Sequence, residues 1–426
     1  MNTTETINQN DEKIFTKSFF LIFGSLLFSA LVMYALMSTV TEYATSMGTS
    51  ATLAGLVSGI YIFGGLCSRI YSANALERRS WKKLAIVFLS IHFLACILYF
   101  FANNISSLLI VRFIHGLGFG ATSNAIVTIA SAILPKKRFA EAFGYFMLGT
   151  TISVGLGPYI SGFCYDNWGA LGSFTLATIF GGIALLCIIL LDVSKYELKN
   201  SDDDNSILEK DNSANDIEKS TKEITAKDIN DSIDNKNGIR RLVDRIFEVS
   251  AIPVSLFTGL TSLGYVSILS FYRLYAVEVD LVSAFSIFFL IYSVVLLASR
   301  PIAGKIQDKH GDKIIVFTGI LAQSIGLFLI AWIPSTLTVF ICAVCAALGF
   351  GTLNSACTAI VTRNAPVERR PFAISTFYIF CDGTMGFGPA LLGSFVSLSS
   401  GYAPVYFISS FITLLALPIA IFALKK

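Results

Sequence analysis

Gly118-Phe119-Gly120 is repeated as Gly349-Phe350-Gly351, 231 residues further along the chain. The same offset relates residues on both sides of this stretch, and no insertion interrupts the register. The other pairs are Tyr61 and Tyr292, Ser68-Arg69 and Ser299-Arg300, Pro135 and Pro366, Arg138 and Arg369, Gly157-Pro158 and Gly388-Pro389, and Gly162 and Gly393. Similarity at a fixed offset indicates two homologous halves, the architecture of many secondary transporters. Positions at which the halves differ are therefore the first place to look for function.

The composition of the 426-residue chain is that of a membrane protein, with 54% hydrophobic and only 14% charged residues. A run of about 20 apolar residues crosses the hydrocarbon core as a helix, because its backbone groups find no water there. We therefore expect an all-α membrane protein with twelve transmembrane helices in two pseudo-symmetric six-helix bundles. The predicted spans are residues 17–41, 51–72, 83–101, 106–134, 141–164, 170–192, 247–276, 281–303, 314–333, 337–362, 372–397 and 403–424.

The chain divides into four predicted segments. Residues 1–16 are a cytoplasmic tail, 17–192 the first bundle and 247–426 the second bundle. Residues 193–246 form a cytoplasmic linker, largely disordered, because its acidic central part has no Phe or Trp to build a core. A regulatory docking role is the alternative for the linker.

The Lys and Arg residues of the short connections all fall on one side, which predicts that both termini are cytoplasmic in a plasma or inner membrane. The net charge of +3 follows from this bias and indicates no nucleic-acid partner. Neither a phosphate-binding GxxxxGK[ST] loop nor the hydrolase motifs HExxH and GxSxG occur, so we expect no enzyme and no cofactor. All eight cysteines lie in apolar runs and are interpreted as packing residues, and no metal site is predicted. We expect a monomer.

The connection after the eighth span reads Gly304-Lys-Ile-Gln-Asp308-Lys309-His-Gly311-Asp312-Lys313. It resembles the signature loop of the major facilitator superfamily, except at Asp312. The resemblance implies a loop that opens and closes with the cytoplasmic gate. In the first half, Glu77 and Arg78 keep the charges but both glycines are lost. The alternative is a basic loop without a gating role.

The fourth span carries Arg112, His115 and spaced glycines, and the fifth carries Gly149, Gly157, Pro158 and Gly162. These stretches resemble the drug:proton antiporter branch of the superfamily and its sugar-efflux-like exporters. Small residues four apart allow helices to approach closely, and the second half repeats the motif at Gly388 and Pro389.

Three ionisable residues are candidates for proton coupling: Asp382, Arg112 and His115. Asp382 lies near the middle of the eleventh span, where the repeat places Thr151 in the first half. Arg112 and His115 correspond to Ala343 and Ala346. Because the symmetry-related positions carry no charge, the fold itself does not require these groups. The alternatives are a solvated carboxyl group, structural pairing of the Arg and an ordinary buried His.

Six residues are candidates for the substrate cavity: Tyr34, Tyr265, Tyr61, Tyr292, Asn124 and Asn354. Plain packing is the alternative for each. We interpret His92 as structural and expect Arg273 to reach the membrane interface, with anion binding as the alternative.

The sequence thus predicts a proton-coupled exporter (antiporter) of a small organic or amphipathic compound, of the multidrug kind, working by alternating access. One alternative is a proton-coupled importer of a sugar or organic acid. The other is a transporter-like membrane sensor whose linker is the output.

Overall fold

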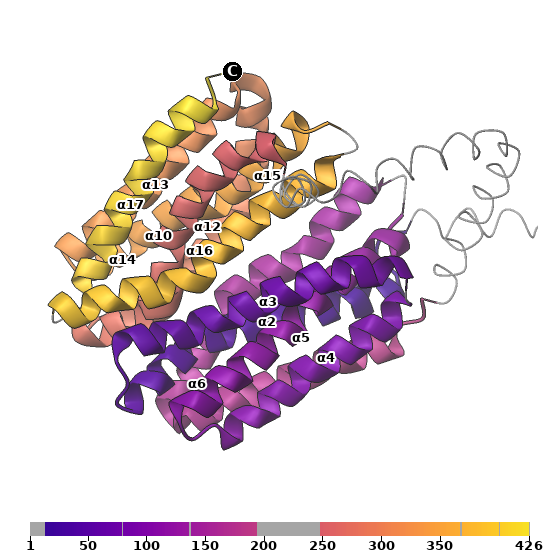
Figure 1. Cartoon of the computed structure of the whole chain (residues 1–426), viewed down its shortest axis with the longest axis horizontal. Helices are drawn as coiled ribbons and strands as arrows, with labels where there is room; N and C mark the ends of the chain where they lie inside the picture. The colour runs from indigo at the N-terminus through magenta and orange to yellow at the C-terminus, as the bar shows by residue number, and fades with distance from the viewer. Residues whose placement is uncertain are drawn as a thin grey trace, which may run out of the picture.

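The computed structural model describes residues 13–78, 80–135, 138–193, 248–366, 369–399 and 401–425. The predicted linker and most of the predicted tail lie outside the described residues. Two helical bundles lie side by side, one from each half of the chain (Figure 1).

The first bundle consists of five long helical elements. Its longest, α6, contains both the fifth and the sixth predicted spans, which meet at Gly169 in a left-handed backbone conformation (φ 65°). The elements are α2 (Lys17–Ser46), α3 (Ala51–Arg78), α4 (Trp81–Leu98), α5 (Ile105–Ile133) and α6 (Phe139–Leu190). A 3-10 turn, η1 (Tyr99–Phe101), follows α4.

The second bundle repeats this order. Its elements are α10 (Ile252–Glu278), α11 (Val282–Ser286), α12 (Phe288–His310), α13 (Asp312–Trp332), α14 (Thr336–Ala346), the π-helical turn η5 (Ala347–Gly351), α15 (Thr352–Asn364), α16 (Arg370–Ser399) and α17 (Ala403–Ala423). Among the described residues, eleven helices are long and apolar enough to cross a membrane, and α6 accounts for two of the twelve predicted spans. The predicted all-α fold is confirmed.

Equivalent residues begin equivalent helices. Asn104 caps α5 through a reciprocal hydrogen-bonded box with Ser107, and Ser335 caps α14 in the same way with Thr338. Asn104 and Ser335 stand 231 residues apart. Each box satisfies backbone N–H groups that the first helical turn would leave without partners. The sequence repeat is therefore also a repeat of local structure.

The two bundles meet along α3 with α16, and along α6 with α12. On the first of these contacts the backbones touch at glycines. A Cβ atom on Gly55 would lie 2.1 Å from the carbonyl oxygen of Pro389, and one on Gly59 would lie 1.7 Å from that of Gly386. Such distances leave room only for hydrogen, so glycine is required at these positions.

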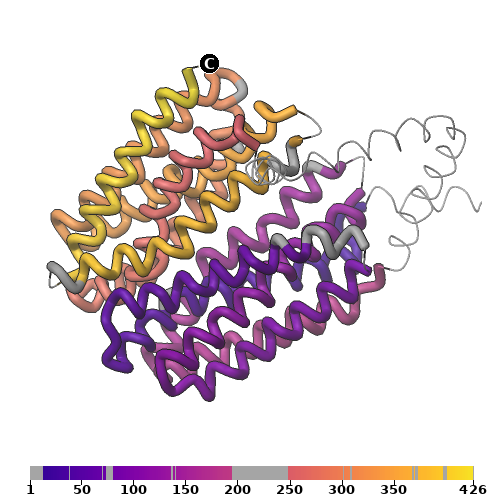
Figure 2. The backbone as a smooth tube through the Cα atoms, viewed as in Figure 1, coloured from indigo at the N-terminus to yellow at the C-terminus, as the bar shows by residue number. Residues whose placement is uncertain are grey.

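These close contacts belong to the end of the molecule opposite the Lys and Arg connections, which we call the outer end. The backbone trace shows the bundles in contact there and diverging toward the other end, where the C-terminus lies (Figure 2). We call that other end the inner end. The structure thus has its two halves closed together on the outer side.

A Gly59→Ala substitution should force α3 away from α16 and open the outer end, because the added methyl group cannot fit against Gly386. We expect a loss of about 1–3 kcal/mol in stability of the closed form. The reporter is a Ser58→Cys substitution, whose side chain is buried against Ser270, labelled with a membrane-impermeant maleimide.

The matched control is Gly383→Ala on α16, where a Cβ atom would meet nothing within 4 Å. Equal labelling in the Gly59→Ala, Gly383→Ala and parent proteins would contradict the packing argument.

Candidate functional site

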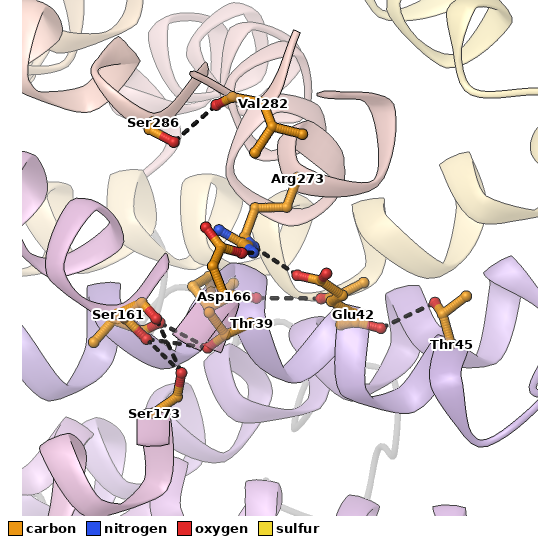
Figure 3. Close-up of polar contacts among 12 residues, drawn as sticks. Thr39, Glu42, Thr45, Ser161, Asp166, Ser173, Arg273, Val282 and Ser286 are labelled. Atoms are coloured by element: carbon orange, nitrogen blue, oxygen red, sulfur yellow. Dashed lines mark hydrogen bonds and ion pairs between the residues drawn. The ribbon is translucent and has the colours of Figure 1, made fainter. Parts of the chain in front are cut away.

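Three charged side chains from three helices meet at the outer end of the contact between the halves. The Nε atom of Arg273 on α10 donates to Glu42 on α2 at 2.5 Å, and its Nη2 atom donates to Asp166 on α6 at 2.5 Å. Figure 3 shows Arg273 reaching between the two carboxylates. We call these three residues the outer cluster. The expectation that Arg273 reaches the membrane interface is wrong, because only 8% of its side chain is exposed.

Glu42 and Arg273 occupy equivalent positions of the two repeats, since they stand 231 residues apart. Equivalent positions can touch each other only on the pseudo-twofold axis. The axis therefore runs through an ion pair at the outer end, with opposite charges supplied by the two halves. Separating the halves there must expose or strand a buried charge, which is costly.

A cavity of about 90 Å³ adjoins the outer cluster and is lined by Glu42, Asp166, Tyr272, Arg273 and Ser286 with neighbouring apolar side chains. This volume is far below the roughly 300 Å³ of the smallest usual ligand pockets. In this form the cavity beside the outer cluster is therefore too small to hold an organic substrate.

Aromatic side chains of the second bundle gather further inward. The ring of Tyr265 on α10 stacks on Phe350 of η5 at 4.4 Å and on Tyr292 of α12 at 5.6 Å. Tyr34 on α2 is the repeat equivalent of Tyr265, and the charges of Arg69, Arg300 and Asp382 all act on its hydroxyl group. Tyr34 also packs against the hydrophobic cluster that contains Tyr265 and Tyr292, so three predicted cavity residues lie together near these charges. Sequence reasoning missed Phe350, although it belongs to the repeated Gly-Phe-Gly stretch.

The other three predicted cavity residues have different surroundings. Asn124 donates its amide to the carbonyl oxygen of Arg69 and to Ser72, and so ties α5 to α3. The ring of Tyr61 lies under the guanidinium group of Arg112, 4.6 Å from its Cζ atom. The Oδ1 atom of half-buried Asn354 has no hydrogen-bond partner among the described residues. Asn124 and Tyr61 therefore have partners within the first bundle.

Asp382 on α16 forms an ion pair across the two halves. Its Oδ2 atom accepts from the Nη1 atom of Arg69 on α3 at 2.7 Å. The repeat-related contact joins Arg300 on α12 to Thr151 on α6, with 3.4 Å between Nη1 and Oγ1. Equivalent arginines thus meet a carboxylate at one interface and a hydroxyl group at the other. The repeated Ser-Arg dipeptide could have pointed to both arginines, but no role for either was predicted from the sequence.

Arg112 and His115 lie inside the first bundle rather than beside Asp382. Arg112 is fully buried, and it donates to the carbonyl oxygen of Val57 at 3.0 Å and to the Tyr99 hydroxyl at 3.4 Å. His115 shares that hydroxyl through its Nδ1 atom at 2.9 Å. Within the described ranges no carboxylate pairs with Arg112. The three predicted coupling residues therefore form two separate sites, one between the halves and one within the first half.

The predicted packing motif lies against neighbouring helices. A Cβ atom on Gly157 would come within 2.9 Å of Tyr34, one on Gly162 within 2.6 Å of Arg273, and one on Gly388 within 3.1 Å of Val266. A Cβ atom on Gly149 would have more room beside α2, because it would lie 3.4 Å from the ring of Phe23. Pro158 lies within α6. Gly157 and Gly162 thus let α6 approach the residues on the axis.

In the predicted gating loop, Gly311 ends α12 with a left-handed backbone (φ 81°), while Gly304 and Lys309 lie in the exposed last turns of that helix. The side chains of Glu77, Arg78 and Asp308 lie outside the described residues. Asp312, the position at which the loop departs from the family pattern, accepts from Gln307 at 2.8 Å and pairs with Arg363. This carboxylate thus ties the loop to the inner end of α15.

A second ion pair at the inner end joins Glu248, just before α10, to Arg369, just before α16. The hydrogen bond from Arg369 lowers the pKa of Glu248. The pair lies within the second half and fixes the entry of α10 against α16.

Exchanging the charges of the outer cluster should test its role as a closure. Arg273→Glu places three acids together and should open the outer end, because like charges a few ångströms apart repel. The double variant Glu42→Arg with Arg273→Glu should close it again, since the two positions are related by the pseudo-twofold axis. Maleimide labelling at Ser58→Cys reports whether the outer end is open or closed in each variant.

Recovery in the double variant is the informative outcome. If the double variant labels as fast as the Arg273→Glu single variant, the ion pair on the axis does not control the outer end.

Solved structures of transporters share this fold. The nucleoside transporter NupG superimposes with a TM-score of 0.68 at 13% sequence identity, and the alignment covers 97% of this chain and 100% of that one. A peptide transporter POT in complex with sulfate gives 0.69 at 15% identity, covering 96% and 94%. At such identities the likeness shows the fold alone.

Relatives found by sequence include two transporters of microorganisms. An uncharacterized MFS-type transporter of Methanocaldococcus jannaschii is 23% identical over 366 residues, which cover 85% of this chain and 87% of the relative. The purine ribonucleoside efflux pump NepI of Escherichia coli is 23% identical over 152 residues, 36% of this chain and 38% of the pump.

The family model of the Major Facilitator Superfamily matches residues 22–291 and 254–426, and so covers nearly the whole chain. Together with the repeated halves and their meeting on a common axis, this match shows that the chain belongs to the Major Facilitator Superfamily.

Proposed function

We propose that this chain is a proton-coupled secondary transporter that exports a small organic compound by alternating access. It would work as a monomer in the cell membrane, with both termini in the cytoplasm. The ion pair between Arg69 and Asp382 is the observation that carries the proposal. It joins the two halves, and its carboxylate can take up a proton.

The pair lies at the inner margin of the contact between α3 and α16. From the outer end inward, that contact passes through Gly55 with Pro389 and Gly59 with Gly386, and then reaches Arg69 with Asp382. The two side chains are only 31% and 17% exposed. A proton on Asp382 would replace an ion pair by a neutral carboxyl group beside an unpaired guanidinium group, which weakens the closed outer end.

The free-energy change on protonating Asp382 is large enough to couple proton binding to opening of the outer end. Coupling free energies of about 1–3 kcal/mol change the ratio of two states by about 5- to 150-fold. Breaking a buried ion pair by removing one charge costs about 3–5 kcal/mol, and partial exposure of this pair reduces the value. Protonation of one carboxyl group can therefore shift the balance between outer-closed and outer-open forms.

Export is supported by the motifs of the fourth and fifth spans and by the relative NepI, whose name gives purine ribonucleoside efflux. The first compounds to test are therefore purine ribonucleosides, measured in everted vesicles with and without a proton gradient.

Asp382→Asn should abolish gradient-driven accumulation, because the Asn side chain cannot bind and release the coupling proton. Downhill exchange of the same compound should survive, since exchange needs no net proton movement. Accumulation and exchange are measured on the same vesicles.

Glu278→Gln is the matched control, because Glu278 lies at the end of α10 and accepts from the backbone of Tyr402. Undiminished uphill transport in Asp382→Asn would remove Asp382 from the coupling mechanism.

A second candidate function, proton-coupled import of an organic acid, is favoured by Arg300. Its repeat equivalent Arg69 pairs with a carboxylate, whereas Arg300 donates to the Thr151 hydroxyl and has no carboxylate partner among the described residues. A substrate carboxylate would supply the missing charge. A proton on Asp382 also releases Arg69 to bind an anion, so proton and anion would bind together and move in the same direction.

Arg300→Gln separates the two candidates. If the substrate is an organic acid, this variant should lower affinity at least tenfold, and Arg300→Lys should recover part of it. If the substrate is a neutral nucleoside, both variants should bind it like the parent. Uptake of radiolabelled inosine and benzoate in vesicles of both orientations gives the measurement.

A further inference from the structure

Three side chains that can bind metal meet inside the first bundle. They are His92 and Cys96 on α4 and His115 on α5, and one ligand atom from each lies within 4.8 Å of the others. All three residues are fully buried. His92 and Cys96 stand one helical turn apart, so their side chains leave the same face of α4.

Neither ring nitrogen of His92 forms a well-aligned hydrogen bond with a described residue, although the backbone of His115 lies within reach of the ring. A buried polar group normally has a hydrogen-bond partner. An imidazole without a well-aligned one, beside two further potential ligands, is what an empty metal site would show. The ring of His92 lies 4.4 Å from that of His115. Packing alone does not satisfy its nitrogen atoms.

The contacts of His115 place one of its ring nitrogens beside the sulfur atom of Cys96. Tyr99 engages its Nδ1 atom at 2.9 Å, and the Nε2 atom points to the Cys96 sulfur at 3.7 Å. A metal ion about 2.0–2.3 Å from each ligand atom would hold nitrogen and sulfur about 3.5–3.8 Å apart. A second-shell hydrogen bond that fixes the other ring nitrogen is usual for metal-binding His.

The repeat shows that the fold does not require these residues. Their equivalents in the second half are Gln323, Leu327 and Ala346. The helices approach closely at the same place in both halves, because a Cβ atom on Gly118 would lie 2.6 Å from His92 and one on Gly349 would lie 2.6 Å from Gln323. All three ligands are thus present in one half and absent from the equivalent positions of the other.

We propose that His92, Cys96 and His115 bind one monovalent copper ion. Thiolate and imidazole ligands suit this soft ion. On binding, the Cys96 S–H bond is replaced by an S–Cu bond, the proton leaves to solvent, and copper keeps its oxidation state. The thiolate and the ion then cancel in charge.

The neutral charge of a monovalent ion bound to one thiolate favours this ion over a divalent one. The charge of Arg112 acts on both Cys96 and His115. A divalent ion with one thiolate would leave a second positive charge beside this buried guanidinium group, at a high electrostatic cost in apolar surroundings. The bound ion would also tie α4 to α5 and hold His115 in one orientation.

The test is copper binding to the purified full chain in detergent, under anaerobic reducing conditions, in competition with bathocuproine disulfonate. We expect one Cu(I) per chain. His92→Gln and Cys96→Leu, which introduce the residues of the other half, should each bind at least tenfold more weakly. Cys357→Ser should bind like the parent, because Cys357 is a buried cysteine of the second half.

X-ray absorption of the copper-loaded parent should show both nitrogen and sulfur ligands. The proposal would be overturned if the parent retained no copper or if the copper had sulfur ligands alone. It would also be overturned if His92→Gln and Cys96→Leu bound copper as tightly as the parent does. Zn(II) binding more tightly than Cu(I) would overturn the choice of ion. None of these readouts depends on transport.

Discussion

At the contact between the two halves of this molecule, charges taken out of water are compensated by opposite charges of the other half. Arg273 is held by carboxylates of the first half, and Asp382 by an arginine of the first half. Each half alone would carry an uncompensated buried charge at these places. The closed outer end is thus stabilised by interactions that exist only while the halves stay together, and moving the halves apart changes the cost of each charge.

The pseudo-twofold axis decides which charges can meet. Residues equivalent by the repeat touch each other only on the axis, as Glu42 and Arg273 do. Away from it, equivalent contacts occur twice, as with Arg69 and Asp382 on one side and Arg300 and Thr151 on the other. The replacement of a carboxylate by Thr151 turns a symmetric pair of contacts into two different ones. One can respond to a proton and the other can accept a negatively charged group.

Much of the fold could be predicted from the sequence, because apolar length and the fixed offset report directly on spans and halves. Asp382 stood out as the acid placed deep within a span, and Tyr34, Tyr265 and Tyr292 do lie together. Arg69, the partner of Asp382, was missed because an arginine near the inner end of a span resembles the ordinary positive charges of that end. Arg273 was misjudged because an arginine near the end of a span usually extends to the membrane interface. The grouping of His92, Cys96 and His115 depends on how α4 packs on Gly118, and a sequence does not show which helix faces another.

The central claim is that a proton on Asp382 weakens the closed outer end. Its most direct test is the distance between spin labels at Ser46 and Asp280, which are exposed near the outer ends of α2 and α10. The measurement needs a background in which the half-buried cysteines Cys67, Cys164, Cys187 and Cys345 are replaced by serine. We predict that lowering the pH lengthens this distance, and that Asp382→Asn shows the long distance at every pH. A distance independent of pH in the parent, or an Asp382→Asn variant that still responds to pH as the parent does, would contradict the account.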